Sequence, residues 1–269
     1  MTFQVFRRLI VSASLNRTQA AQFIGALTMI WAIMCLPIPF FEERGYSLTT
    51  VSARDEGLGE FKNASILLVA FVLLAINWHQ QVLLNGVTLR ERVGSRLFGY
   101  GIRWLGYLLI ATALFLGMFA ALYVALEQPA ADGVRDELGI GLLFALFVVS
   151  VIILSLFFRG WTGLVAIAVN EPKVGIFASW RNTKPFRFEA LLLAALLVLL
   201  YFGQGQLDDF LLGLKLNGDT PEGLIEWGAL FFWGLVWSFP AAIVLWLEVA
   251  ILTEFYAASV ASKSVREND

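Results

Sequence analysis

The chain has 269 residues, of which 59% are hydrophobic and 15% are charged, and its formal net charge is −2. A typical soluble domain is about 45–50% apolar and about 25% charged, so this composition excludes an ordinary soluble domain. The single cysteine, Cys35, excludes an intrachain disulfide, and the single histidine, His79, excludes any site built from several histidines of this chain. The sequence accordingly predicts no cofactor and no metal.

Six stretches of at least 18 residues contain no Asp, Glu, Lys or Arg. They are 18–41, 63–89, 104–126, 138–158, 190–207 and 227–247. A helix needs about 20 mostly apolar residues to cross the hydrocarbon of a bilayer. A soluble helical protein can contain one such run by chance but hardly six. The runs therefore predict an all-α polytopic membrane bundle that forms a single integral domain over 1–269.

The N-terminal segment 1–17 predicts an amphipathic helix lying in the membrane interface, because Phe3, Phe6 and Ile10 recur at helical spacing beside arginines. The apolar run that follows is long enough to span a membrane, so we interpret it as an uncleaved anchor. Transmembrane helices are expected near 20–41, 63–85, 103–126, 142–169, 188–207 and 227–258.

The basic residues predict the orientation of these six helices. Fourteen Lys and Arg residues lie on the side that holds both termini, and five lie on the other side. Because Lys and Arg concentrate in cytoplasmic loops, both termini are expected in the cytoplasm and the chain in a bacterial inner membrane. The basic rim is expected to contact anionic lipid headgroups. The charges are spread over loops, so they do not indicate a nucleic-acid partner.

The connection between the fourth and fifth expected spans carries a distinct pattern. Val174, Phe177 and Trp180 share one helical face, and Arg181 and Lys184 follow before a proline. This pattern favours a short interfacial helix anchored by Trp180, although an ordinary loop holding a tryptophan is the alternative. Arg103 is a further expected anchor at the cytoplasmic interface, beside Tyr100 at the start of the third span.

Three pairs of helices can be interpreted as three repeats of one hairpin, with the even-numbered helices ending near Asn85, Asn170 and Ser259. The fourth helix then continues past Arg159 through an apolar stretch. Arg159 and Glu248 would each lie roughly 16 Å from their helix ends at 1.5 Å per residue, near the middle of the membrane.

Equal depth makes an ion pair between Arg159 and Glu248 a reasonable prediction, because a lone charge at the bilayer centre costs roughly 2.5–3.5 kcal/mol. His79 and Glu254 match in depth as well and would form a second polar layer. The alternative is that Arg159 lies at the interface with the following residues flat on the membrane. Such a cluster can fix helix packing, or it can serve transport or lipid binding.

Two short motifs resemble a known family. The segment Trp78-His79-Gln80-Gln81-Val82-Leu83-Leu84 is similar to Trp-His-Arg-Phe-Val-Leu-Leu, and Ser179-Trp180-Arg181-Asn182-Thr183-Lys184 to Ala-Trp-Arg-x-Thr-Lys. Both occur in uncharacterised bacterial six-helix inner-membrane proteins that resemble the membrane domain of glycerophosphodiester phosphodiesterases and the YciC-like proteins. Gln80 replaces the usual arginine, and Lys184-Pro185 stands where Gly-Asn is usual. The resemblance implies a multi-helix bundle without a catalytic domain.

The sequence contains no nucleophile triad, phosphate loop or metal pattern, so we expect a protein that is not an enzyme. The expected function is a scaffold, assembly or membrane-organising role that contacts lipids or other membrane proteins. The alternative is a small transporter or lipid-handling protein with its polar site at Arg159, Glu248 and His79.

Overall fold

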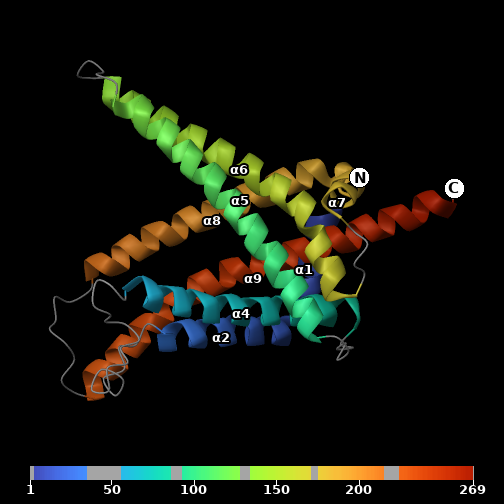
Figure 1. Cartoon of the computed structure of the whole chain (residues 1–269), viewed down its shortest axis with the longest axis horizontal. Coiled ribbons are helices and arrows are strands. Elements are labelled where there is room, and N and C mark those ends of the chain that lie inside the picture. Colours follow the sequence, from blue (N-terminus) through green and yellow to red (C-terminus); the bar gives the residue numbers. More distant parts are fainter. Residues whose placement is uncertain are drawn as a thin grey trace. The chain divides into compact units, whose positions relative to one another are not determined.

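The computed structural model describes residues 3–34, 56–85, 93–127, 134–170, 175–214 and 224–268, and every regular element within these ranges is a helix. The elements are α1 (Gln4–Leu15), α2 (Arg17–Met34), α4 (Glu56–Leu83), α5 (Val93–Glu127), α6 (Val134–Ala168), α7 (Ile176–Asn182), a 3-10 turn η1 (Lys184–Phe186), α8 (Arg187–Leu214) and α9 (Leu224–Asn268). Figure 1 shows these helices along the chain. The predicted all-α class is therefore confirmed for the described part of the chain.

The chain divides into two compact units. The first comprises residues 1–10, 89–199 and 251–269. Within it α5 lies along α6, and α7 packs on α6 (Figure 1). Its core surrounds the last part of α6, where residues 160–168 are buried one after another. A helix that is buried on every side has no amphipathic face, so the uniform apolar sequence of this stretch suits its place. The ring of Phe158 stacks on Phe255 of α9 with centroids 6.2 Å apart.

The second unit comprises residues 11–88 and 200–250. Within it α2 packs along α4, and the rings of Phe23 and Phe71 meet edge to face with centroids 6.4 Å apart. The contact between α2 and α9 is close because Gly234 has no side chain: a Cβ placed on it would lie 3.4 Å from the Ala32 Cα. Small residues allow helix backbones to approach in this way.

Five helical segments are long and apolar enough to cross a membrane among the described residues. They are Ser65–Leu83, Gly94–Leu114, Phe144–Ala168, Lys184–Leu207 and Gly234–Ala261. The described part of the chain is thus all-helical, with several helices suited to crossing a membrane. The first expected span, 20–41, is described only as far as Met34, where α2 ends, and residues 35–41 lie outside the described ranges. A count of six spans therefore stays a prediction.

Two of the three expected helix ends share one conformation. After α4 and α6, Asn85 and Asn170 adopt positive φ angles of 51° and 67°. Asparagine tolerates this left-handed conformation, which commonly ends a helix. The third expected end differs, because α9 continues past Ser259 to Asn268. The backbone conformation therefore supports matching helix ends in the first two hairpins only, at Asn85 and Asn170. The three-fold repeat stays a prediction.

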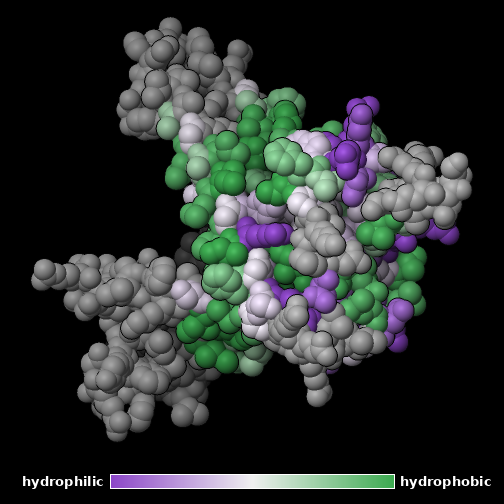
Figure 2. Space-filling model, turned by 45° about the vertical axis from the view of Figure 1, so that its right-hand side comes forward, coloured by the Kyte–Doolittle hydropathy of each residue, from purple (hydrophilic) through white to green (hydrophobic). Residues whose placement is uncertain are grey.

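Large apolar side chains face outward along the spans. Exposed examples include Leu109 and Leu114 on α5, Phe144 and Ile152 on α6, and Leu199 on α8. Figure 2 shows hydrophobic residues over much of the described surface in this view. Soluble monomers rarely expose large contiguous apolar patches. The outward faces of these helices are suited to lipid chains.

Candidate membrane-interface site

Arg159 lies on α6 and contacts α7. Its Nη2 donates a hydrogen bond to the carbonyl oxygen of Trp180 at 3.3 Å, and its guanidinium carbon lies 4.7 Å from the centroid of the Trp180 ring. A cation above an indole face is attracted by the ring quadrupole. Arg159 therefore has a partner on the adjacent helix, and α6 does continue past it to Ala168.

Thr183 holds the same junction together from the other side. Its buried Oγ1 lies 2.9 Å from the carbonyl oxygen of Ser179, 3.2 Å from that of Trp180 and 3.4 Å from that of Arg159. Pro185 follows in η1 and cannot donate a backbone hydrogen bond, so α7 ends here. One hydroxyl thus ties the end of α7 to the backbone of α6.

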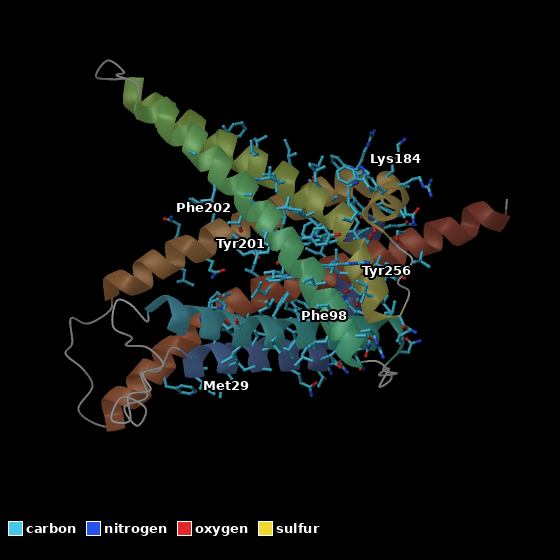
Figure 3. The ribbon with its side chains drawn as sticks, viewed as in Figure 1. Met29, Phe98, Lys184, Tyr201, Phe202 and Tyr256 are labelled. Carbon is cyan, nitrogen blue, oxygen red and sulfur yellow. The ribbon has the colours of Figure 1, made fainter. Side chains whose placement is uncertain are left out.

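The short helix predicted between the fourth and fifth spans is present as α7. Its apolar side chains point outward: Phe177 is 91% exposed and Trp180 is 39% exposed. Arg181 and Lys184 are exposed beside them, and Figure 3 labels Lys184 at this corner of the unit. A helix docked in water would bury its aromatic face, so this arrangement is typical of an element that lies at a membrane interface. Val174 lies outside the described residues.

The N-terminal helix α1 joins this region through a carboxylate from α8. Glu189 is only 7% exposed, and its two oxygens accept hydrogen bonds from the backbone amides of Gln4 at 3.1 Å, Val5 at 2.6 Å and Phe6 at 3.3 Å. The first amides of a helix lack partners inside the helix, and its N-terminal end carries partial positive charge. The Glu189 carboxylate accepts hydrogen bonds from these amides and places negative charge beside the positive helix end, so it fixes α1 to the start of α8.

The predicted amphipathic segment at the N-terminus is present as α1, which begins at Gln4, one residue after Phe3. Val5 and Leu9 face the protein, whereas Phe3, Phe6 and Ile10 are exposed together with Arg7 and Arg8. We name one set of exposed side chains from α1, α7 and η1 the rim surface. It consists of Phe3, Phe6, Phe177 and Trp180 with Arg7, Arg8, Arg181 and Lys184.

The remaining expected anchor, Arg103, is exposed on α5. One turn later, Tyr107 directs its hydroxyl to the carbonyl oxygen of Gly160 at 3.5 Å and its ring to Trp161, with centroids 5.5 Å apart. Phe157 stacks on Trp161 with centroids 4.9 Å apart. Aromatic rings therefore fill the contact between α5 and α6 next to Arg159.

Glu248 has a partner that the sequence did not indicate. The hydroxyl of Tyr201 on α8 donates a hydrogen bond to Glu248 Oε2 on α9 at 3.1 Å. Tyr201 is 40% exposed and its neighbour Phe202 is exposed further, and Figure 3 labels both on α8. The carboxyl group thus sits at the seam between two candidate membrane helices in the second unit.

The four residues of the predicted polar cluster divide equally between the two units. Arg159 and Glu254 belong to the first unit, and His79 and Glu248 to the second. The Arg159–Glu248 pair and the His79–Glu254 layer therefore stay predictions. His79 and Glu254 are both buried, and each has interactions of its own. Among the described residues no three His, Cys, Asp or Glu side chains gather in a way that could hold a metal ion.

Sequence reasoning missed Glu189, Thr183 and Tyr201. Thr183 lies within the quoted tryptophan motif, so that motif was a usable signal for it. Glu189 stands in the first turn of α8, where an acid is expected on dipole grounds, and it instead serves the first turn of α1, far away in the sequence. No local pattern predicts that contact.

Comparison with protein-family models, with curated proteins and with solved structures finds no match to this chain. The family resemblance of the two motifs stays a prediction.

Proposed function

We propose that this chain is a non-enzymatic protein of the bacterial inner membrane that binds anionic lipids at its inner rim and organises the membrane or its protein partners there. In this proposal it has six spans, both termini are cytoplasmic, and it belongs with the six-helix inner-membrane proteins that its two tryptophan motifs resemble. The described helices support an integral membrane protein of several spans, and the finer points rest on the charge pattern.

The rim surface is the observation that carries the proposal. Phe177 and Trp180 are exposed beside Arg181 and Lys184, on a helix held in place by Thr183. Tryptophan side chains are enriched at the depth of the lipid headgroups. Each Lys or Arg near an anionic membrane surface contributes about 1 kcal/mol of attraction. A tied-down surface that combines both is suited to recruiting anionic lipid.

Lipid selectivity tests this function directly. The protein is reconstituted into mixed bilayers, and the association of spin-labelled phosphatidylglycerol is compared with that of spin-labelled phosphatidylcholine by electron paramagnetic resonance. We expect the wild type to favour phosphatidylglycerol, and the variant with Arg7, Arg8, Arg181 and Lys184 all changed to Gln to lose at least half of that preference.

The matched control removes four charges from the predicted outer face, by changing Glu42, Glu43, Asp55 and Glu56 to the corresponding amides. This control should not weaken the preference for phosphatidylglycerol. Equal selectivity in the wild type and the rim variant would contradict the proposed function.

The Tyr201–Glu248 contact favours a second candidate function, a small transporter or lipid-handling protein. Polar groups within membrane helices often mark the path of a substrate. A transporter needs water to reach Glu248, whereas a scaffold keeps it dry. A single cysteine placed at Leu245, one turn before Glu248 on the same face of α9, in a chain with Cys35→Ser, would react quickly with a water-soluble maleimide in the first case and remain unlabelled in the second.

A further inference from the structure

The hydrogen bond between Tyr201 and Glu248 lies on the outside of the second unit. Tyr201 is 40% exposed, Glu248 is partly exposed, and the bond of 3.1 Å that joins them is exposed as well. Both residues belong to candidate spans, and Glu248 stands near the middle of Gly234–Ala261. Ionisable side chains at membrane depth almost always face the interior of a bundle or a water-filled cavity. The face that carries this pair is therefore unsuited to lipid chains.

The next turn of α8 extends this polar face. Gln204 and Gly205 follow Tyr201 by three and four residues, a spacing that places all three on one side of a helix. Gln204 is partly exposed, and its side chain makes no hydrogen bond among the described residues. Gly205 is exposed, and a Cβ placed on it would meet no atom within 4 Å. We name Tyr201, Gln204, Gly205 and Glu248 the seam surface.

The seam surface offers both halves of a hydrogen bond. Glu248 accepts the Tyr201 hydroxyl at Oε2, and its Oε1 accepts no hydrogen bond from the described residues. The side-chain amide of Gln204 carries two N–H donors. A surface that holds both a free acceptor and a free donor is self-complementary across a two-fold axis, because such an axis presents the same patch of each copy to the other.

We propose that the seam surface is the contact between two copies of this chain, packed as a two-fold dimer within the membrane. Gln204 of each copy donates to Glu248 of the other, and the open position at Gly205 lets the two α8 helices approach closely, as small residues do in membrane helices. Both polar groups then lie inside a larger bundle and away from lipid. This association goes beyond the proposed function and does not depend on lipid binding at the rim surface.

Single-molecule photobleaching of the full chain counts copies in bilayers of phosphatidylcholine, a lipid without net charge, as the protein-to-lipid ratio is lowered. We expect wild-type dimers that dissociate on dilution. Gln204→Leu removes the donor from both copies and should weaken dimerisation about fivefold or more, the effect of losing two modest hydrogen bonds at once. Gly205→Leu fills the space at the contact and should weaken dimerisation about tenfold or more.

Gly106→Leu is the matched control, because Gly106 lies in the candidate span of α5 and a Cβ there also meets no atom within 4 Å. It should leave dimerisation within about twofold of the wild type. Cross-linking gives a second measurement that does not depend on a bulky substitution. A single cysteine at Gly205, in a chain with Cys35→Ser, should form a disulfide between two copies when copper phenanthroline oxidises it. A single cysteine at Ile152, exposed on α6, should cross-link far more slowly.

A wild type that stays monomeric at the highest protein-to-lipid ratio would overturn the dimer and leave the proposed function standing. Dimers that Gln204→Leu and Gly205→Leu do not weaken, or weaken no more than Gly106→Leu does, would overturn the seam surface as the contact. Equal cross-linking of the cysteines at Gly205 and Ile152 would do the same. Absence of selectivity for spin-labelled phosphatidylglycerol would contradict the proposed function alone, since dimerisation is measured in a bilayer without anionic lipid.

Discussion

Two ionisable side chains in candidate membrane helices, Arg159 in the first unit and Glu248 in the second, have different kinds of partner. Arg159 contacts a main-chain carbonyl and an indole ring on α7, a short helix that does not cross the membrane. Glu248 accepts one hydrogen bond from a phenol on a neighbouring long helix. Both partners are neutral groups. Within each unit, the described partner of the ionisable group is therefore a neutral dipole or ring.

The difference between the two regions is in how firmly they are held. In the first unit, the Thr183 hydroxyl ties α7 to α6, and aromatic rings fill the contact between α5 and α6. In the same unit, Glu189 ties α1 to α8. Around Glu248 the described polar contact is a single bond, and Tyr201 is partly exposed to the surroundings. We expect substitutions in the first region to cost more stability than substitutions at the Tyr201–Glu248 pair.

The largest effect is expected at Glu189. Changing Glu189 to Ala leaves the first three amides of α1 without their acceptor in a buried place, which should lower the free energy of unfolding by about 2–3 kcal/mol. Glu189→Gln keeps one acceptor oxygen and should cost about half as much. Reversible unfolding in mixed SDS micelles measures both, and a loss below about 0.5 kcal/mol for Glu189→Ala would show that α1 is not held by this carboxylate.

A smaller effect is expected where α2 meets α9. Gly234→Leu would force a large side chain against the Ala32 backbone and should cost about 1–3 kcal/mol by overpacking. Gly234→Ala is the control: its Cβ would lie at ordinary contact distance and should change stability little. The same unfolding assay applies. Equal stability of the leucine variant and the wild type would contradict the close approach of the two helices.

The smallest effect is expected at Tyr201. Tyr201→Phe removes the hydroxyl that bonds Glu248, and hydrogen bonds between membrane helices contribute about 0.6 kcal/mol on average. Phe202→Leu, on the neighbouring exposed position, serves as the control and should be close to neutral. If Tyr201→Phe destabilised the protein more than Glu189→Ala, the contrast drawn between the two regions would be reversed.

The sequence predicted those features that depend on local pattern. Apolar runs located the five candidate spans among the described residues, and the Trp180 face with Pro185 behind it predicted α7. Helix ends were harder to predict, because charged residues end a hydrophobic run but do not end a helix. Helix α6 begins at Val134 and α4 at Glu56, and both start before their apolar runs. Matching depths identified Arg159 and Glu248 as residues of interest. It did not identify their partners, since Trp180 offers a main-chain oxygen and Tyr201 an ordinary aromatic side chain.

The α1 face illustrates the same limit. Phe6 and Ile10 lie on one exposed side of α1, whereas Phe3 precedes the helix, which begins at Gln4. Spacing alone does not say which apolar stripe faces the protein. Val5 and Leu9 form the buried stripe because Glu189 fixes the start of α1. A long-range contact decides the rotation of the helix, and no local signal encodes it.

The contact between Arg159 and Trp180 is tested most directly by a pair of double-mutant cycles that measure the free energy of unfolding. The first combines Arg159→Gln with Trp180→Leu, and the second combines Arg159→Gln with Glu248→Gln. A cation–π contact contributes about 0.5–1 kcal/mol at exposed sites and about 2 kcal/mol when desolvated, so the first cycle should show a coupling energy in that range. We predict a coupling of this size between Arg159 and Trp180. Coupling near zero in the first cycle would contradict the contact between α6 and α7, and strong coupling in the second cycle would support the predicted ion pair between Arg159 and Glu248.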